Sequence, residues 1–247
     1  MSSLLKNHPF AVNAFFDSST VLTYAAPKEQ LQKFIPDCLE LDTFNDKWGF
    51  VACAMVQTKQ LRPKGFPKFL GNDFFLIGFR IFVRYHTSWG KRLRGLYIIK
   101  SETNKKKMEY FGNLFTHYKY TTTDIQQKLE GKTTIISSAK SNFNIRIAHT
   151  AEETTALPRD SPFSNWKEAR RFAGPLPFTF TYNEPKKEVL IIEGVRTNWK
   201  PTPLKILNHS IAFVERLNLE GIVLANAFKV EQVPYSWKRG KIDIWKP

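Results

Sequence analysis

The sequence predicts a mostly β (α+β) protein built on one long, curved antiparallel sheet with about three short helices. Many segments alternate apolar and polar residues and are rich in Thr, Ile, Val, Tyr and Phe, which is typical of strands. The 247-residue chain is 42% hydrophobic and 14% aromatic, which is sufficient for a large core. No internal repeat is visible, and we expect one domain that spans residues 1–247.

The strands are placed by alternation and by the turn residues between them. Asn45, Asp46 and Lys47 favour a hairpin turn between the second and third strands, and residues 183–186 favour another between the last two. In chain order, strands are expected over residues 19–25, 39–44, 48–57, 73–86, 93–101, 116–126, 133–139, 143–149, 178–182 and 188–195, and residues 204–219 fit either a helix or a strand.

Three helices are expected, near residues 27–35, 103–115 and 163–173. Pro27 suits the first helical position, where the missing backbone N–H carries no penalty. Thr103 or Asn104 is the expected N-cap of the second helix, and Ser161 or Ser164 that of the third. In each helix, apolar residues recur at helical spacing.

The chain is strongly basic. It has 37 Lys and Arg against 22 Asp and Glu, for a formal net charge of +15. Nucleic acid, acidic lipid or an anionic substrate would suit this charge, but an ordinary soluble protein with a basic surface is the favoured explanation. The loop at residues 61–71 interleaves basic and aromatic residues, as single-strand binders do. No nucleic-acid-binding motif accompanies it, so nucleic acid is not the expected partner.

Two cysteines, Cys38 and Cys53, lie in apolar surroundings and are expected to be buried thiols and not a disulfide. Residues 1–13 lack the basic start, apolar stretch and cleavage site of a signal peptide. The longest uncharged apolar segments are far shorter than the ~20 residues that a bilayer span needs. The expected location is therefore the cytoplasm, with no membrane span.

No common catalytic motif is present. The phosphate-binding loop, the His-Glu-x-x-His zinc motif and the Gly-x-Ser-x-Gly nucleophile elbow are all missing. The chain has no cysteine pair at ligand spacing, so a structural zinc site is not expected. We expect neither a metal nor another cofactor. The five histidines are widely scattered: His8, His86, His117, His149 and His209.

Charged residues within apolar strands are the main candidates for a site. Arg80 and Arg84 share one face of the 73–86 strand, and Lys100 and Glu102 share a face of the 93–101 strand and its end. Glu193 lies among valines and isoleucines of the 188–195 strand. An ionised side chain in such surroundings needs a partner or a wet cavity. A barrel-like sheet with a polar-lined interior would provide the cavity, and structural ion pairs or solvent exposure are the alternatives.

Several segments together resemble a known family. They are FIPDCLELDTF with the following WGFV (residues 34–51), GFRIFV (78–83, with Arg80), GLYII (95–99), VPYS (233–236) and IDIW (242–245). Their order and spacing are similar to those of the YqjF-like proteins, an uncharacterised family in the acetoacetate decarboxylase-like superfamily. The resemblance spans nearly the whole chain. It implies an antiparallel, barrel-like fold around an internal cavity.

The same resemblance implies that acetoacetate decarboxylase activity is missing. That enzyme uses a lysine that forms a Schiff base beside a second cationic group. The segment of this chain similar to the enzyme's lysine segment is residues 112–118, in which His117 and Tyr118 fall on the lysine pair. Leu76 falls near the position of an expected acidic residue. Because neither group carries over, decarboxylation of acetoacetate is not expected.

Three functions remain open. The first is binding of a small carboxylate or carbonyl compound, with ligand contacts from Arg80, Arg84, Glu102, Tyr118 and Glu193. The second is catalysis on such a compound, with Lys100 or Lys119 as nucleophile or charge partner and His117 as acid–base group. The third is binding of nucleic acid or another anionic surface. A homo-oligomer is compatible with all three, and the sequence does not decide whether the protein is an enzyme.

Overall fold

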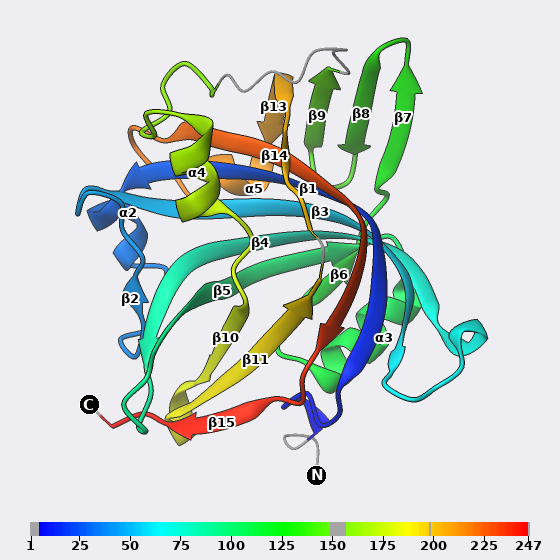
Figure 1. The fold of residues 1–247 in the computed structure, drawn as a ribbon, viewed down its shortest axis with the longest axis vertical. Helices are drawn as coiled ribbons and strands as arrows, with labels where there is room; N and C mark the ends of the chain where they lie inside the picture. The colour runs from blue at the N-terminus through cyan, green and yellow to red at the C-terminus, as the bar shows by residue number, and fades with distance from the viewer. Residues whose placement is uncertain (1–4, 149–156, 198, 247) are drawn as a thin grey trace.

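The computed structural model describes residues 5–148, 157–197 and 199–246. Its main feature is an 11-stranded sheet that curls around a central axis. In Figure 1 the long strands sweep around the interior as a barrel-like wall. Seven strands form this wall, in the spatial order β14 (Val223–Trp237), β1 (Val12–Pro27), β3 (Trp48–Pro63), β4 (Asn72–His86), β5 (Arg92–Thr103), β10 (Phe178–Asn183) and β11 (Glu188–Arg196).

The two ends of this order meet. Gly194 of β11 lies opposite Trp237 of β14, and the pairing continues for three residues. Neighbouring strands of the wall are antiparallel, except for a short parallel contact between β5 and β10. The prediction of a mostly β, barrel-like antiparallel fold is therefore confirmed.

Shorter strands extend the sheet, and a second sheet covers part of its outside. The short strands are β2 (Glu40–Leu41), β6 (Tyr120–Thr122), β12 (Thr202–Pro203) and β15 (Lys241–Ile244). The second sheet contains β13 (Lys205–Ile211), β9 (Phe143–Ala148), β8 (Thr133–Ser138) and β7 (Gln126–Glu130), in that order. It stands above the barrel at the top right of Figure 1.

The long strands are buried on both faces. On β4, Ile77 and Phe79 face outward and pack in one cluster with Ile145 of the second sheet. Phe74 and Leu76 face the opposite way, into the barrel. The strand therefore lacks the polar solvent face of a typical antiparallel strand, because both of its faces meet other parts of the protein.

Four α-helices lie in the described parts of the chain: α2 (Lys28–Gln32), α3 (Lys106–Phe115), α4 (Trp166–Ala173) and α5 (Ala212–Glu215). The first three correspond to the expected helices, but the expected caps were wrong. Asn165 caps α4 by accepting from the Glu168 amide, and Asn104 accepts from the Phe75 amide of β4. None of these helices has the length and apolar character needed to cross a membrane.

Several expected elements differ from the structure. The expected strand over residues 116–126 is limited to β6, and β7 follows it. Residues 45–47 do form a tight turn, in which Asn45 and Asp46 adopt positive φ and Phe44 bridges to Trp48. The expected hairpin across this turn is limited to that single bridge, because β2 itself pairs with β4 and not with β3. Residues 204–219 contain both a strand, β13, and a helix, α5. His149 lies outside the described residues.

A buried carboxylate fastens the C-terminal strand to the barrel. Asp243 of β15 accepts from the Tyr85 hydroxyl at 2.7 Å and from the Ser88 amide at 2.8 Å. Burial acts to raise the pKa of Asp243, but hydrogen bonds from Ser88 and Tyr85 outweigh it, so the pKa lies below its ordinary value. The ionised form is therefore bound more tightly in the folded state than in the unfolded state.

We expect Asp243→Asn to lower the free energy of unfolding by about 1–3 kcal/mol at neutral pH, because partners of the carboxylate lose an ionised acceptor. The contribution of Asp243 is fully present above its ordinary pKa and is lost as pH falls through the lowered folded value. Urea unfolding at pH 7 and at about pH 3 measures both effects. The gap between wild type and variant should shrink in acid, and a gap that does not depend on pH would contradict this assignment.

Candidate functional site

The barrel encloses a cavity of about 590 Å³. Its wall is formed by inward-facing residues of β1, β3, β4, β5 and β14, by α3, and by the segment that follows α4. Most of the lining is apolar, including Val56, Phe74, Leu76, Ile98 and Phe228. The volume lies within the range of about 300–1,000 Å³ that is usual for small-molecule sites.

All the charged side chains that line the cavity are basic: Arg62, Arg80, Lys107 and Arg196. No Asp or Glu of the described chain is among the lining residues. Two of the lining residues are exposed to solvent, Lys107 and Phe111, and both belong to α3. The cavity is therefore a positively charged and largely apolar space that reaches solvent beside α3.

Arg80 is the basic residue at the centre of the β4 wall. Within the described residues its guanidinium forms no hydrogen bond or ion pair. It folds back over Gly78, where an added Cβ would lie 2.9 Å from the Arg80 Nη2 atom. The missing side chain at Gly78 thus leaves the space that the guanidinium occupies. A cation in such an apolar wall lacks the counter-ion that usually compensates burial.

Three tyrosines surround the charge of Arg80. Burial raises the pKa of Tyr120 to about 12 and raises the pKa of Tyr118 and Tyr235 above the ordinary value, while the charge of Arg80 opposes each rise. All three phenols therefore stay protonated at neutral pH and can donate hydrogen bonds. Among the described residues, the buried Tyr118 hydroxyl makes no hydrogen bond of good geometry. The nearby Thr179 side chain acts to lower the Tyr118 pKa, against the larger effect of burial.

A second arginine contributes to another part of the wall. Arg196 donates to the backbone carbonyls of Pro175 and Leu176, and its guanidinium lies 5.0 Å from the centre of the Trp199 ring. Its Nε atom is buried and has no partner. Because two of its N–H groups already donate to backbone carbonyls, Arg196 is less available to a ligand than Arg80.

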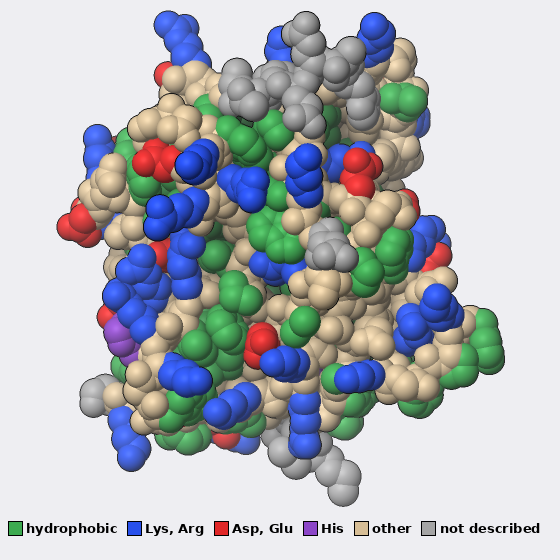
Figure 2. All heavy atoms as spheres, viewed as in Figure 1, with side chains coloured by type: hydrophobic (Ala, Val, Ile, Leu, Met, Phe, Trp, Pro, Cys, Tyr) green, Lys and Arg blue, Asp and Glu red, His purple; other side chains and the backbone are tan. Residues whose placement is uncertain are grey.

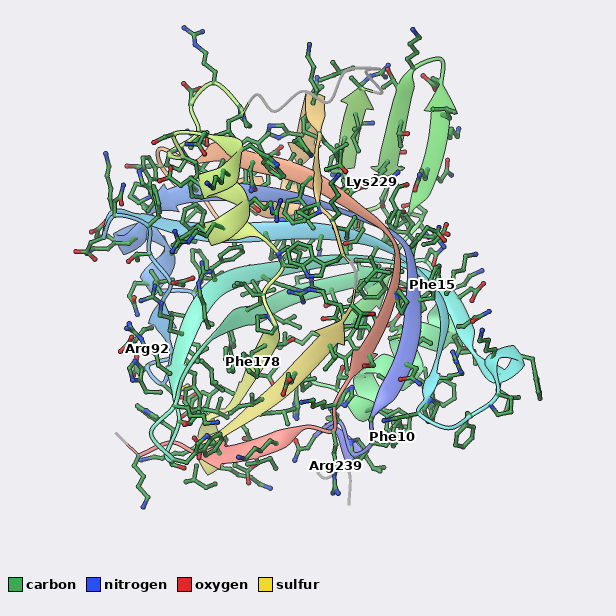
Figure 3. The ribbon with its side chains drawn as sticks, viewed as in Figure 1. Phe10, Phe15, Arg92, Phe178, Lys229 and Arg239 are labelled. Atoms are coloured by element: carbon green, nitrogen blue, oxygen red, sulfur yellow. The ribbon has the colours of Figure 1, made fainter. Side chains whose placement is uncertain are left out.

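His8 also lines the cavity and was not predicted. Burial lowers its pKa, although backbone hydrogen bonds oppose the shift, so the imidazole is neutral at physiological pH. Its Nδ1 atom is buried without a partner. Phe10, two residues further on, also lines the cavity and packs edge-on against Phe115 of α3. Figure 3 labels Phe10 at the lower end of β1.

Two of the predicted site residues line this cavity: Arg80 and Tyr118. Lys100 does not, because β5 contains a bulge at Ile99. Arg80 lies opposite Ile98, but Phe79 lies opposite Lys100, so one residue is skipped. The bulge turns Lys100 and Glu102 to the outer face of the sheet. There they form an ion pair at 2.5 Å, and Glu102 also accepts from the Ser141 hydroxyl.

Glu193 and Arg84 also lie away from the cavity. Glu193 shares its strand face with Val189 and Ile191, as expected, but this face is the outer one, and its carboxylate binds Lys238 at 2.8 Å. Arg84 binds the fully buried Asp42 at 2.6 Å. The expectation that these charges meet in one cavity was therefore wrong for both, and structural ion pairs satisfy them instead.

His117 and Lys119 lie outside the cavity lining. Tyr118 and Tyr120 line the cavity, and the chain between them turns at Lys119. Lys119 is exposed and has a positive φ of 53°. The His117 Nε2 atom lies 3.1 Å from the Asn7 side-chain oxygen, and burial lowers its pKa, as does the nearby charge of Lys6. Neither residue lines the cavity.

Gly78→Ala tests whether the Arg80 guanidinium lies over Gly78. The added Cβ would displace the tip of Arg80, which is a flexible side chain, and would remove a glycine from a strand. We expect Gly78→Ala either to increase the free energy of unfolding or to lower it by less than about 1 kcal/mol. Urea unfolding measures the change, and a loss of more than about 2 kcal/mol would contradict the assigned position of the guanidinium.

Comparison with solved structures places this fold among the acetoacetate decarboxylase-like proteins. Acetoacetate decarboxylase from Legionella pneumophila shares 13% identity, with a TM-score of 0.61, over 95% of this chain and 87% of that chain. An acetoacetate decarboxylase-like enzyme from Sphingomonas wittichii RW1 shares 12% identity, with a TM-score of 0.56, over 99% and 95%. The enduracididine biosynthesis enzyme MppR, complexed with pyruvate, shares 9% identity, with a TM-score of 0.55, over 95% and 90%.

The chain belongs to the DUF2071 family, described as "Uncharacterized conserved protein (COG2071)", whose model matches residues 15–236. No curated protein matches the sequence. The predicted placement, in an uncharacterised family with an acetoacetate decarboxylase-like fold, is thus confirmed. At such low identities the solved structures establish the fold and not the reaction.

Proposed function

We propose that this protein binds a small organic anion, a carboxylate with an apolar body, inside the barrel. The observation that carries the proposal is the unpartnered guanidinium of Arg80 in a cavity whose charged lining residues are all basic. A carboxylate from a ligand would supply the missing counter-ion. Arginine is well suited to this task, since its planar fork donates two parallel hydrogen bonds to a carboxylate.

The neighbouring phenols support an oxyanion in particular. Neutral hydroxyl groups at Tyr118, Tyr120 and Tyr235 are potential donors near Arg80, and the Tyr118 hydroxyl makes no hydrogen bond of good geometry among the described residues. A ligand carboxylate has several lone pairs to accept from such donors. The apolar remainder of the wall would hold the ligand's body by burial of apolar surface.

The catalytic alternative has less support. Lys100, Lys119 and His117 are all absent from the lining, and the exposed Lys107 is the one lysine in it among the described residues. A Schiff-base nucleophile needs an amine that is unprotonated near neutral pH, which burial or a neighbouring cation normally provides. His8 is a lining histidine that burial keeps neutral, and a proton-transfer role for it would require a substrate already held by Arg80.

A matched pair of probes tests the binding proposal. Octanoate and octanol have the same apolar chain and differ in the head group. Calorimetric titration and thermal shift should show that octanoate binds and stabilises the protein, and that octanol binds at least about tenfold more weakly. Mass spectrometry of the purified native protein should then identify a retained organic acid. Equal affinity for the two probes, or binding of neither, would contradict the proposal.

Decarboxylation of acetoacetate is not expected at an enzymatic rate. Borohydride treatment with acetoacetate should leave no stoichiometric covalent adduct, because no buried lysine of the described chain faces the cavity. Intact-mass measurement detects the adduct, and carbon dioxide release measures turnover. A stoichiometric adduct on Lys100, Lys107 or Lys119, together with carbon dioxide release above background, would restore the decarboxylase function.

A further inference from the structure

The loop that joins β3 to β4 is ordered but displays apolar side chains to solvent. The last ladder pair below the loop joins Leu61 and Asn72. Beyond it, Arg62 donates to the Phe66 carbonyl, the Lys64 amide donates to Ala11, and a short 3-10 helix, η1 (Lys68–Leu70), forms the tip. These contacts give the tip a defined backbone and a fixed set of outward-facing side chains.

Three large apolar side chains stand out at this tip: Phe69 is 83% exposed, Phe66 54% and Leu70 53%. Scattered exposed apolar residues are common on proteins, but a cluster on a projecting, ordered loop usually marks an interaction site. In Figure 1 the loop projects from the right of the barrel, and Figure 2 shows hydrophobic side chains at the same edge with Lys and Arg beside them.

The loop is also purely basic. Residues 61–71 contain Arg62, Lys64 and Lys68 and no acidic residue. The N-terminal end of α3 adds residues 105–107, all lysines and all exposed. Elsewhere the positive charge is spread over the surface, as the separate positions of Arg92, Lys229 and Arg239 in Figure 3 illustrate. The loop tip thus combines three exposed apolar side chains with basic side chains within a few residues.

We propose that this tip docks on the surface of an anionic lipid bilayer. Phe66, Phe69 and Leu70 would enter the boundary between head groups and acyl chains, and Lys64 and Lys68 would pair with anionic head groups. This combination of apolar side chains with flanking basic ones is the physical requirement for peripheral binding to such membranes. A nucleic acid would use the lysines equally well, but it would gain little from Leu70, which has no ring on which a base could stack.

Docking through the tip would also bring the cavity near the bilayer. Leu61 at the base of the loop and Met108 of α3 pack against the same interior cluster, and both line the cavity. The solvent-exposed lining residues, Lys107 and Phe111, lie on α3 as well. The membrane proposal does not depend on the cavity's ligand, and its test uses no ligand.

Vesicle co-sedimentation tests the proposal. The protein is mixed with phosphatidylcholine vesicles, with or without about 30% phosphatidylglycerol. The variants are Phe66→Ser/Phe69→Ser/Leu70→Ser and Lys64→Gln/Lys68→Gln. The matched controls lie on the second sheet: Leu129→Ser, which alters a 70% exposed side chain, and Lys128→Gln/Lys132→Gln. All the changed side chains are exposed, so each variant should keep the wild-type melting temperature.

We expect wild type to bind the anionic vesicles, more weakly as salt rises. Each tip variant should bind at least about tenfold more weakly, and the controls should bind as wild type does. The proposal is overturned if wild type does not sediment with anionic vesicles, or if the tip variants bind them as well as wild type. It is also overturned if the tip changes abolish retention on a single-stranded oligonucleotide and leave vesicle binding intact.

Discussion

Replacing Arg80 with methionine is expected to remove anion binding and, at the same time, to make the ligand-free protein more stable. Methionine has a similar length and would fill the same space with an apolar side chain. The ligand-free protein would no longer hold a cation without a partner in an apolar wall, so its free energy of unfolding should rise by about 1–3 kcal/mol. Affinity for octanoate should fall about 100-fold, since the charged hydrogen bonds are lost.

Urea unfolding of the ligand-free protein and calorimetric titration measure the two effects. Arg146→Met is a suitable control, because Arg146 is exposed on β9, away from the cavity. It should change stability by less than about 1 kcal/mol and leave octanoate affinity unchanged. An Arg80→Met protein that is destabilised and still binds octanoate would show that Arg80 has a structural partner and not a ligand.

Asp42→Ala is expected to have the largest effect on stability. The Asp42 side chain is fully buried and binds two arginines, Arg84 at 2.6 Å and Arg94. Arg94 in turn stacks over the Phe172 ring of α4, 4.4 Å from its centre. Removing the carboxylate would leave two guanidinium groups without their shared partner, which should cost about 3–5 kcal/mol. The cost should appear as a shift of the urea midpoint with an unchanged slope.

Asp46 offers a matched control for this prediction. It also forms an ion pair, with Lys28 at 2.7 Å, but its side chain is 84% exposed. Asp46→Ala should therefore change the free energy of unfolding by less than about 1 kcal/mol. If Asp42→Ala and Asp46→Ala were equally mild, the buried charge cluster would not be a major support of the fold.

Local patterns in the sequence carried much information about the fold. Alternation along residues 73–86 correctly separated the outward Ile77 and Phe79 from the inward Phe74, Leu76 and Arg80. This worked because a strand has a side-chain period of two, so one face follows from the other. The same logic identifies Tyr120 beside Tyr118, a site residue that the predicted set omitted.

The faces of Lys100 and Glu102 could not be predicted in the same way. A single skipped residue at Ile99 reverses every later side chain of β5. No glycine or proline marks the bulge in the sequence, and the buried ion pair that it creates depends on Phe79, Phe213 and Ser141 from distant segments. Alternation is therefore reliable only between irregularities of the ladder.

Contacts between distant segments were also beyond local patterns. β2 pairs with a β4 segment far away in the chain, with Glu40 opposite Arg84, and Asp42 just after β2 binds the Arg84 side chain. His8 and Arg196 both line the cavity, although they lie far apart in the sequence. Their residue types gave no signal, because an isolated histidine or arginine is common on any surface, and only the curvature of the sheet brings them to one wall.

The most direct test of the central claim is a crystal structure of the protein with octanoate. If the barrel cavity is an anion site, the carboxylate should lie at about 2.7–2.9 Å from the Arg80 guanidinium nitrogens, with the acyl chain against Phe74 and Leu76. The Tyr118 hydroxyl, which makes no hydrogen bond of good geometry among the described residues, should donate to the same carboxylate. A carboxylate bound elsewhere, with Arg80 still unpartnered, would contradict the claim.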